Sequence, residues 1–111
     1  MPGARYRDRI DHMAARIKLP LVALGELCRK WKVEELSIFG SALRDDFRDD
    51  SDVDVLIQLQ PNHGWGWEIF DLETELSALL GRKVDLVFKD ALRNSIRRQK
   101  ILETRQVLYA A

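Results

Sequence analysis

Two aspartates stand two residues apart in a stretch whose pattern is otherwise typical of a β-strand. Residues 52–59 alternate between apolar and other side chains, so that Asp52 and Asp54 fall on one face. Aspartate is depleted in strands, and a carboxylate inside one usually needs a partner. Their Cα atoms would lie about 6.5–7 Å apart, so both carboxylates can converge on one or two divalent cations. Asp85 interrupts a second apolar alternation, at 83–88, and offers a third carboxylate.

Three crowded carboxylates would repel one another and be partly protonated unless cations held them together. A pair of Mg²⁺ ions about 3.5–4 Å apart would relieve that repulsion and form a clamp for in-line displacement at phosphorus. The competing interpretation of an isolated Asp-x-Asp is an exposed strand face. A calcium loop of the EF-hand type is excluded, because its sixth position would be Val55 instead of Gly and its twelfth Pro61 instead of Glu.

A glycine and a serine, Gly40 and Ser41, precede this acidic stretch. Glycine at the end of a strand lets the backbone turn sharply and approach a ligand closely. The Ser41 hydroxyl and the amides that follow could then donate to a phosphate. Gly-Ser alone is a common turn, so its position before the acidic loop carries the argument.

The elements that must position these residues follow from hydrophobic periodicity. The pattern predicts a small mixed α/β (α+β) domain in which helices pack on a short sheet. Gly81 is the expected C-terminal cap of the second helix. The expected helices cover 20–32, 67–80 and 91–108, and the expected strands cover 34–39, 52–59 and 83–88. Residues 1–19 are a basic lead-in, expected to be helical over 4–19.

Taken together, GSALRDDFRDDSDVD is Gly-Ser, ten intervening residues and Asp-x-Asp. With the later VDLV strand at 84–87, this resembles the minimal nucleotidyltransferases of the DNA polymerase β superfamily. Within that group it is most similar to the MntA-type antitoxins encoded beside HEPN-domain toxins. The resemblance covers about residues 20–108 and implies the polymerase β-like nucleotidyltransferase fold, with Mg²⁺-dependent transfer of a nucleoside monophosphate from a nucleoside triphosphate, ATP in the antitoxins.

The resemblance also implies roles for single residues. Asp52 and Asp54 would bridge two Mg²⁺ ions, and Asp85 would ligate the metal beside the attacking hydroxyl and favour its deprotonation. These three are therefore the expected catalytic and metal-binding residues.

Nucleotide binding is implied for three residues that precede the carboxylates. Gly40 and Ser41 would hold the triphosphate, and Arg44 matches a frequently basic position that contacts phosphate. Asp45 departs from the pattern, because many relatives have Gly there, and it adds negative charge near the phosphates.

For the antitoxin relatives, the implied reaction is transfer of AMP to a tyrosine hydroxyl of the HEPN toxin, which neutralises the toxin. Two alternatives stay open. One is a nucleotidyltransferase with a small-molecule acceptor, of the aminoglycoside type, although such enzymes generally carry an additional helical domain. The other is an antitoxin that acts by binding alone, with its carboxylates as relics.

Composition sets limits on the remaining classes. The chain has 111 residues, room for a single domain over 1–111, and its 18 basic and 18 acidic side chains cancel. Basic ends flank an acidic centre. Because the chain has no net positive charge, we do not expect it to bind nucleic acid directly. No apolar run could span a bilayer and the start is unlike a signal peptide, so we expect a cytoplasmic protein without membrane contact. A homo-oligomer stays open.

A few further side chains have two interpretations. Trp65 and Trp67 could stack on a base or contact a partner, or they could cap the helix that follows them. His12 and His63 have no ligand spacing and are expected at the surface. The single cysteine, Cys28, falls on an apolar helical stripe and is expected in the core.

Overall fold

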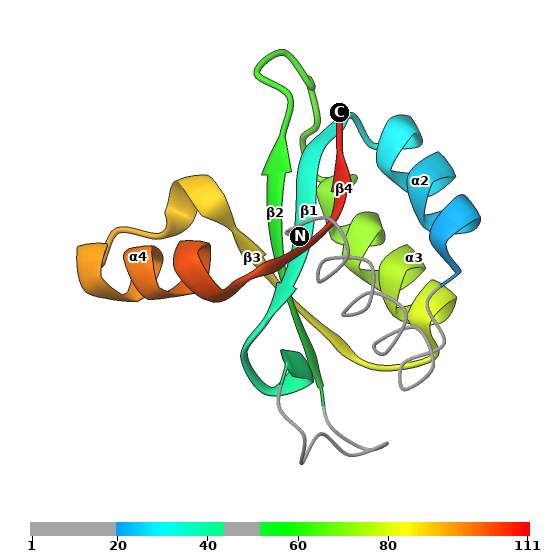
Figure 1. Cartoon of the computed structure of the whole chain (residues 1–111). Coiled ribbons are helices and arrows are strands. Elements are labelled where there is room, and N and C mark those ends of the chain that lie inside the picture. The colour runs from blue at the N-terminus through cyan, green and yellow to red at the C-terminus, as the bar shows by residue number, and fades with distance from the viewer. Residues whose placement is uncertain (1–19, 44–51) are drawn as a thin grey trace.

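A four-stranded mixed sheet forms the centre of the molecule, and the computed structural model describes residues 20–43 and 52–111. The strand order is β3-β2-β1-β4. Strand β1 pairs antiparallel with β2 and with β4, while β2 and β3 run parallel (Figure 1). The strands are β1 (Val33–Phe39), β2 (Val53–Leu59), β3 (Val84–Phe88) and β4 (Gln106–Ala110). A mixed sheet flanked by helices confirms the expected fold class.

Helices α2 (Leu21–Lys30) and α3 (Ile69–Leu80) cover one face of the sheet, and α4 (Ser95–Thr104) lies on the other (Figure 1). The larger core lies between the sheet and helices α2 and α3. Every second residue of β2 points into it, because successive side chains of a strand alternate between the two faces. Its fully buried side chains include Leu24, Cys28, Leu72, Leu76, Val53, Val55 and Ile57. The smaller core, under α4, is formed by Phe39, Leu56, Leu92 and Ile101.

The expected helices at 20–32 and 67–80 and the expected strands at 34–39, 52–59 and 83–88 are confirmed, with every boundary within two residues. Gly81 ends α3 in the left-handed conformation, with φ of 66°, and is its C-terminal cap as expected. Cys28 is fully buried, as its place on the stripe of α2 predicted. The basic lead-in at 1–19 lies outside the described residues.

The helix expected over 91–108 is wrong at both ends. Helix α4 begins at Ser95, where the Asn94 side chain accepts a hydrogen bond of 3.0 Å from the backbone N–H of Arg97. It ends before Arg105, whose backbone is extended, and the chain continues as β4 beside β1. The partner of β4 lies some 70 residues earlier in the sequence, so local periodicity alone could not reveal this strand.

An ion pair fixes the junction between α4 and β4 to β1. The Arg105 guanidinium donates from Nε to Glu35 Oε2 at 2.8 Å, and both side chains are largely buried. This hydrogen bond, more than any other contact, holds the pKa of the Glu35 carboxyl below its usual range. The return of the chain to the sheet is therefore stabilised by a charge-assisted contact.

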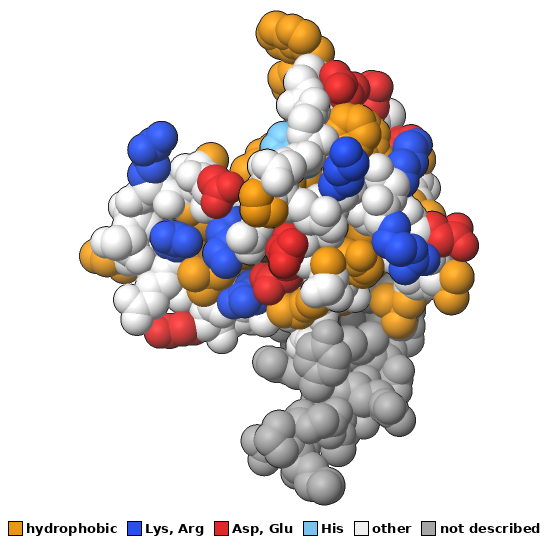
Figure 2. All heavy atoms as spheres, turned by 90° about the horizontal axis from the view of Figure 1, so that it is seen from above, with side chains coloured by type: hydrophobic (Ala, Val, Ile, Leu, Met, Phe, Trp, Pro, Cys, Tyr) orange, Lys and Arg blue, Asp and Glu red, His pale blue; other side chains and the backbone are white. Residues whose placement is uncertain are grey.

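None of the helices in the described part of the chain combines the length and apolar character needed to cross a lipid bilayer. Lys and Arg side chains lie at the surface over α4 (Figure 2). The basic residues Arg97, Arg98 and Lys100 of α4, and Arg93 just before it, are all exposed.

Candidate active site

Two of the three predicted carboxylates occupy register positions opposite each other. Asp54 in β2 pairs with Asp85 in the parallel strand β3. Residues paired across neighbouring strands project to the same face of a sheet, and here the pairing continues with Leu56 opposite Val87, which both pack in the core under α4. Asp54 and Asp85 therefore belong to the face that carries α4, and α2 and α3 cover the opposite face.

Asp52 lies one residue before β2 and is held beside the start of β3. The backbone N–H of Val53 donates to the carbonyl of Lys83 at 3.0 Å. The Lys83 ammonium lies 4.0 Å from Asp52 Oδ2, and the two side chains are 78% and 51% exposed. An ion pair this exposed adds little to stability. Asp52 and Asp85 are both solvent-exposed and Asp54 is half-buried, so the site opens to solvent at its rim.

Gly40 is placed against Asp54 by the pairing of β1 with β2. Phe39, the last residue of β1, is the register partner of Asp54. The next residue, Gly40, has φ of +69°, a conformation that L side chains rarely adopt. A Cβ added at Gly40 would lie 2.6 Å from Asp54 Oδ2, a distance that real Cβ atoms do not show. The carboxylate thus occupies space that exists only because residue 40 has no side chain.

The turn expected after β1 is a short 3₁₀ helix, Gly40–Leu43, which includes Ser41 in its backbone. The pairing of β1 with β2 brings the backbone of the Gly-Ser turn next to the strand of Asp54. Arg44 and Asp45 lie outside the described residues. The binding of a triphosphate by Gly40, Ser41 and Arg44 stays a prediction.

The donor set has the chemistry expected of a magnesium site. Three carboxylates supply only hard oxygen ligands, which Mg²⁺ prefers. Within residues 20–43 and 52–111, no three side chains among His, Cys, Asp and Glu are grouped as a metal centre. Asp54 and Asp85 are brought together by register and Asp52 by the Lys83 contact, but the convergence of all three on a shared ion stays a prediction.

The two tryptophans of the 60–68 loop differ in a way that the sequence did not reveal. Trp65 packs on Trp31 with ring centroids 4.8 Å apart, and its indole N–H donates to the Trp31 carbonyl at 2.6 Å. Trp67 is 85% exposed and stacks on Phe70, itself 65% exposed. His63 is half-buried, and its Nδ1 accepts a hydrogen bond from the backbone N–H of Trp65. The loop follows β2, at the opposite end of that strand from Asp54.

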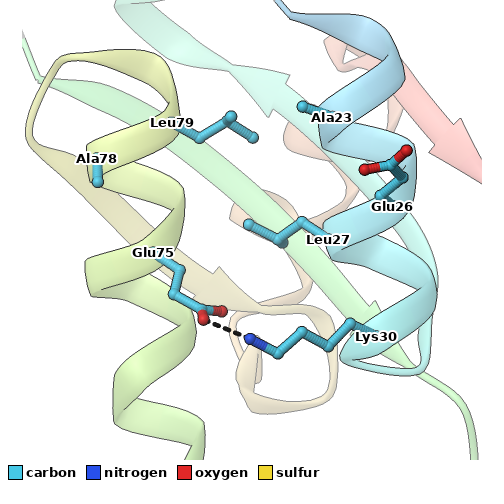
Figure 3. Close-up of a pocket in the computed structure, with 7 residues that line it drawn as sticks. All are labelled: Ala23, Glu26, Leu27, Lys30, Glu75, Ala78 and Leu79. Carbon is cyan, nitrogen blue, oxygen red and sulfur yellow. Dashed lines mark hydrogen bonds and ion pairs between the residues drawn. The ribbon is translucent and has the colours of Figure 1, made fainter.

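A groove between α2 and α3 lies on the other face of the sheet from the carboxylates. Leu27 and Leu79 point toward each other across it, and the Lys30 ammonium meets Glu75 Oε1 at 2.5 Å (Figure 3). Hydrogen bonds from Lys30 and then from Trp31 hold the pKa of Glu75 below its usual range. No residue of this groove is a predicted site residue, so it is separate from the candidate active site.

Comparison with known proteins adds sequence relatives. Residues 22–108 match the family described as the nucleotidyltransferase domain. The chain is 37% identical over 84 residues to the protein adenylyltransferase MntA of Thermococcus cleftensis, covering 76% of this chain and 81% of that protein. It is also 40% identical over 77 residues to MJ0128 of Methanocaldococcus jannaschii, a protein described as a protein adenylyltransferase. This match covers 69% of this chain and 78% of MJ0128.

Solved structures share the fold. One described as a minimal nucleotidyltransferase superposes with a TM-score of 0.67 at 27% identity, covering 82% of this chain and 91% of that one. A toxin–antitoxin structure with AMP-PNP superposes with a TM-score of 0.62 at 20% identity, covering 84% and 75%. At that identity the second likeness concerns the fold alone.

Proposed function

This chain belongs to the nucleotidyltransferase domain family and is a nucleotidyltransferase, and from that premise we propose that it transfers AMP from ATP to a tyrosine hydroxyl of a HEPN-domain toxin, which it neutralises as an antitoxin. The names of the two sequence relatives support a protein acceptor. The toxin–antitoxin structure with AMP-PNP, which shares the fold, suggests the partner and the nucleotide for this proposal. The observation that carries the proposal is the pairing of Asp54 with Asp85 beside Gly40.

Asp52, Asp54 and Asp85 would together hold two Mg²⁺ ions. Their oxygens suit that ion, and Gly40 leaves the Asp54 carboxylate the space that it occupies. Bound Mg²⁺ would supply positive charge that offsets the negative charge of the triphosphate and of the departing pyrophosphate.

The remaining chemistry belongs to the chain's own residues. The acceptor oxygen forms a bond to the α-phosphorus of ATP, and the bond from that phosphorus to the pyrophosphate oxygen breaks in line with it. Asp85, an exposed residue of β3, would favour loss of the proton from the attacking hydroxyl. The Gly40–Leu43 turn binds the triphosphate and holds it in line for attack.

Transfer of label tests this function directly. ATP labelled at its α-phosphate is incubated with Mg²⁺, the chain and a purified candidate HEPN-domain toxin. We expect label on a toxin tyrosine, and a loss of about 100-fold or more in the initial rate for Asp54→Asn. Asp71→Asn is the matched control, because Asp71 is an exposed aspartate on α3, away from the carboxylate face.

Two outcomes would contradict the proposal. Equal labelling by Asp54→Asn would show that the carboxylates are not the reacting site. Neutralisation of an unlabelled toxin by both the native chain and Asp54→Asn would show an antitoxin that acts by binding alone.

A further inference from the structure

Lys83 has a fixed backbone position beside Asp52 in the candidate active site. It directly precedes β3, and its carbonyl accepts the hydrogen bond from Val53 described above. Val53 and Val84 are register partners, so the backbone of Lys83 is level with Asp52. Two residues further along β3 stands Asp85. The side chain of Lys83 therefore starts from a position between predicted metal ligands of two strands.

The contact that its ammonium makes is easily exchanged. Lys83 Nζ lies 4.0 Å from Asp52 Oδ2, at the limit of an ion pair, and 78% of its side chain is in solvent. Such a pair does little for stability, so folding does not explain its place. By contrast, Arg105 meets Glu35 at 2.8 Å with both side chains mostly buried. The Lys83 ammonium can therefore leave Asp52 and contact a ligand at little cost to the stability of the fold.

The chemistry of that ligand follows from the charges around it. Lysine offers a compact positive charge and three donors on a flexible stem, which suits the oxygens of a phosphate chain. Asp52 is one of the residues that would hold Mg²⁺, and a carboxylate engaged in that way no longer needs the ammonium as its counter-charge. The phosphate oxygens of a nucleotide bound at the same carboxylates would then offer the ammonium a new counter-charge.

We propose that Lys83 is a triphosphate-binding residue, whose ammonium is held by Asp52 in the free chain and passes to a phosphate oxygen when the nucleotide binds. This inference rests on the proposed function. It assigns to the start of β3 a part in nucleotide binding beyond the Gly-Ser turn.

Binding measurements on Lys83→Met test the exchange without a catalytic assay. Calorimetry with a non-hydrolysable ATP analogue and Mg²⁺ should show a Kd about 5–10-fold weaker, the size expected for one charge-assisted contact. Mn²⁺ alone should bind as well as in the native chain or better, because a cation beside the carboxylates has been removed. Lys83→Arg should retain most of the affinity for the analogue.

Lys100→Met is the matched control, because Lys100 is an exposed lysine on α4, and its analogue affinity should not change. An unchanged Kd for the analogue in Lys83→Met would overturn the inference. Equal weakening of the analogue and of Mn²⁺ would also overturn it, because Lys83 would then act by shaping the carboxylates. If the native chain binds the analogue but labels no toxin, the proposed acceptor fails while the role of Lys83 can still be decided.

Discussion

Position 40 makes two structural requirements that only glycine meets. Its φ of +69° costs an L side chain about 1–2 kcal/mol, and its missing Cβ leaves room for Asp54 Oδ2. Gly64 has nearly the same φ, +71°, but no atom lies within 4 Å of the Cβ that it would carry. The two glycines therefore separate the effect of backbone strain from that of displacing a carboxylate.

We expect Gly40→Ala to lower the rate of AMP transfer by about 100-fold, because the added methyl group pushes the Asp54 carboxylate aside. Both Gly40→Ala and Gly64→Ala should lose about 1–2 kcal/mol in the free energy of unfolding. Urea denaturation and the labelling assay measure these quantities. A fully active Gly40→Ala would show that the contact has no part in catalysis.

At the scale of elements, the loop of residues 60–68 is anchored by one of its tryptophans. Trp65 contacts Trp31 by its ring and by its indole N–H, and the Lys32 ammonium lies 5.6 Å from the Trp65 ring centroid. We expect Trp65→Ala to lower the free energy of unfolding by about 2–3 kcal/mol, because packing and a hydrogen bond are both lost.

The same substitution two residues later provides the comparison. Trp67→Ala should change the free energy of unfolding by about 0.5 kcal/mol or less, because the side chain is 85% exposed. Urea denaturation followed by circular dichroism measures both variants without depending on tryptophan fluorescence. Equal losses from the two variants would contradict this description of the loop.

The elements also show how far sequence patterns reach. Alternation at 52–59 and helical spacing at 67–80 were sufficient to predict β2 and α3, because each pattern is local. The strand β4 was missed, since its five residues are defined by pairing with β1 and follow a basic helix without a break in composition. Trp65 and Trp67 could not be told apart, because contact with Trp31 depends on tertiary packing.

The residues of the candidate site could be proposed from the sequence, but their contacts could not, and their roles stay predictions. Spacing alone placed Asp52 and Asp54 on one face, and a third carboxylate in another strand was visible in the alternation around Asp85. The contact of Gly40 with Asp54 requires the register of β1 against β2, and the place of Lys83 requires the register of β2 against β3. Neither register is encoded in a local pattern.

At the scale of the whole molecule, the larger core holds an ionisable group whose pKa is strongly shifted. Burial raises the pKa of the Cys28 thiol to about 12, while the neighbouring Arg29 acts weakly in the other direction. The unfolded thiol has a pKa of about 8.5. Because the thiol has a higher pKa in the folded chain, burying it protonated contributes to the free energy of unfolding. This contribution is fully present below about pH 8.5 and is lost as the pH rises toward 12.

We therefore expect the free energy of unfolding to fall more steeply with pH in the native chain than in Cys28→Ala between pH 9 and 11. The difference in slope should approach about 1.4 kcal/mol per pH unit. Urea denaturation at each pH measures it, and comparing slopes removes the constant cost of the cavity left by the substitution. Parallel curves would show that the thiol ionises as readily in the folded chain as in the unfolded one.

The strand order β3-β2-β1-β4 makes β3 a border of the sheet. Asp85 thus stands on the outermost strand, with its side chain exposed, instead of at the bottom of an enclosed chamber. A deep chamber would select small acceptors by size, whereas a carboxylate on a border can be reached side-on by a hydroxyl that projects from a folded macromolecule. The position of one strand at the margin of the sheet thereby leaves the candidate site accessible to a macromolecular acceptor.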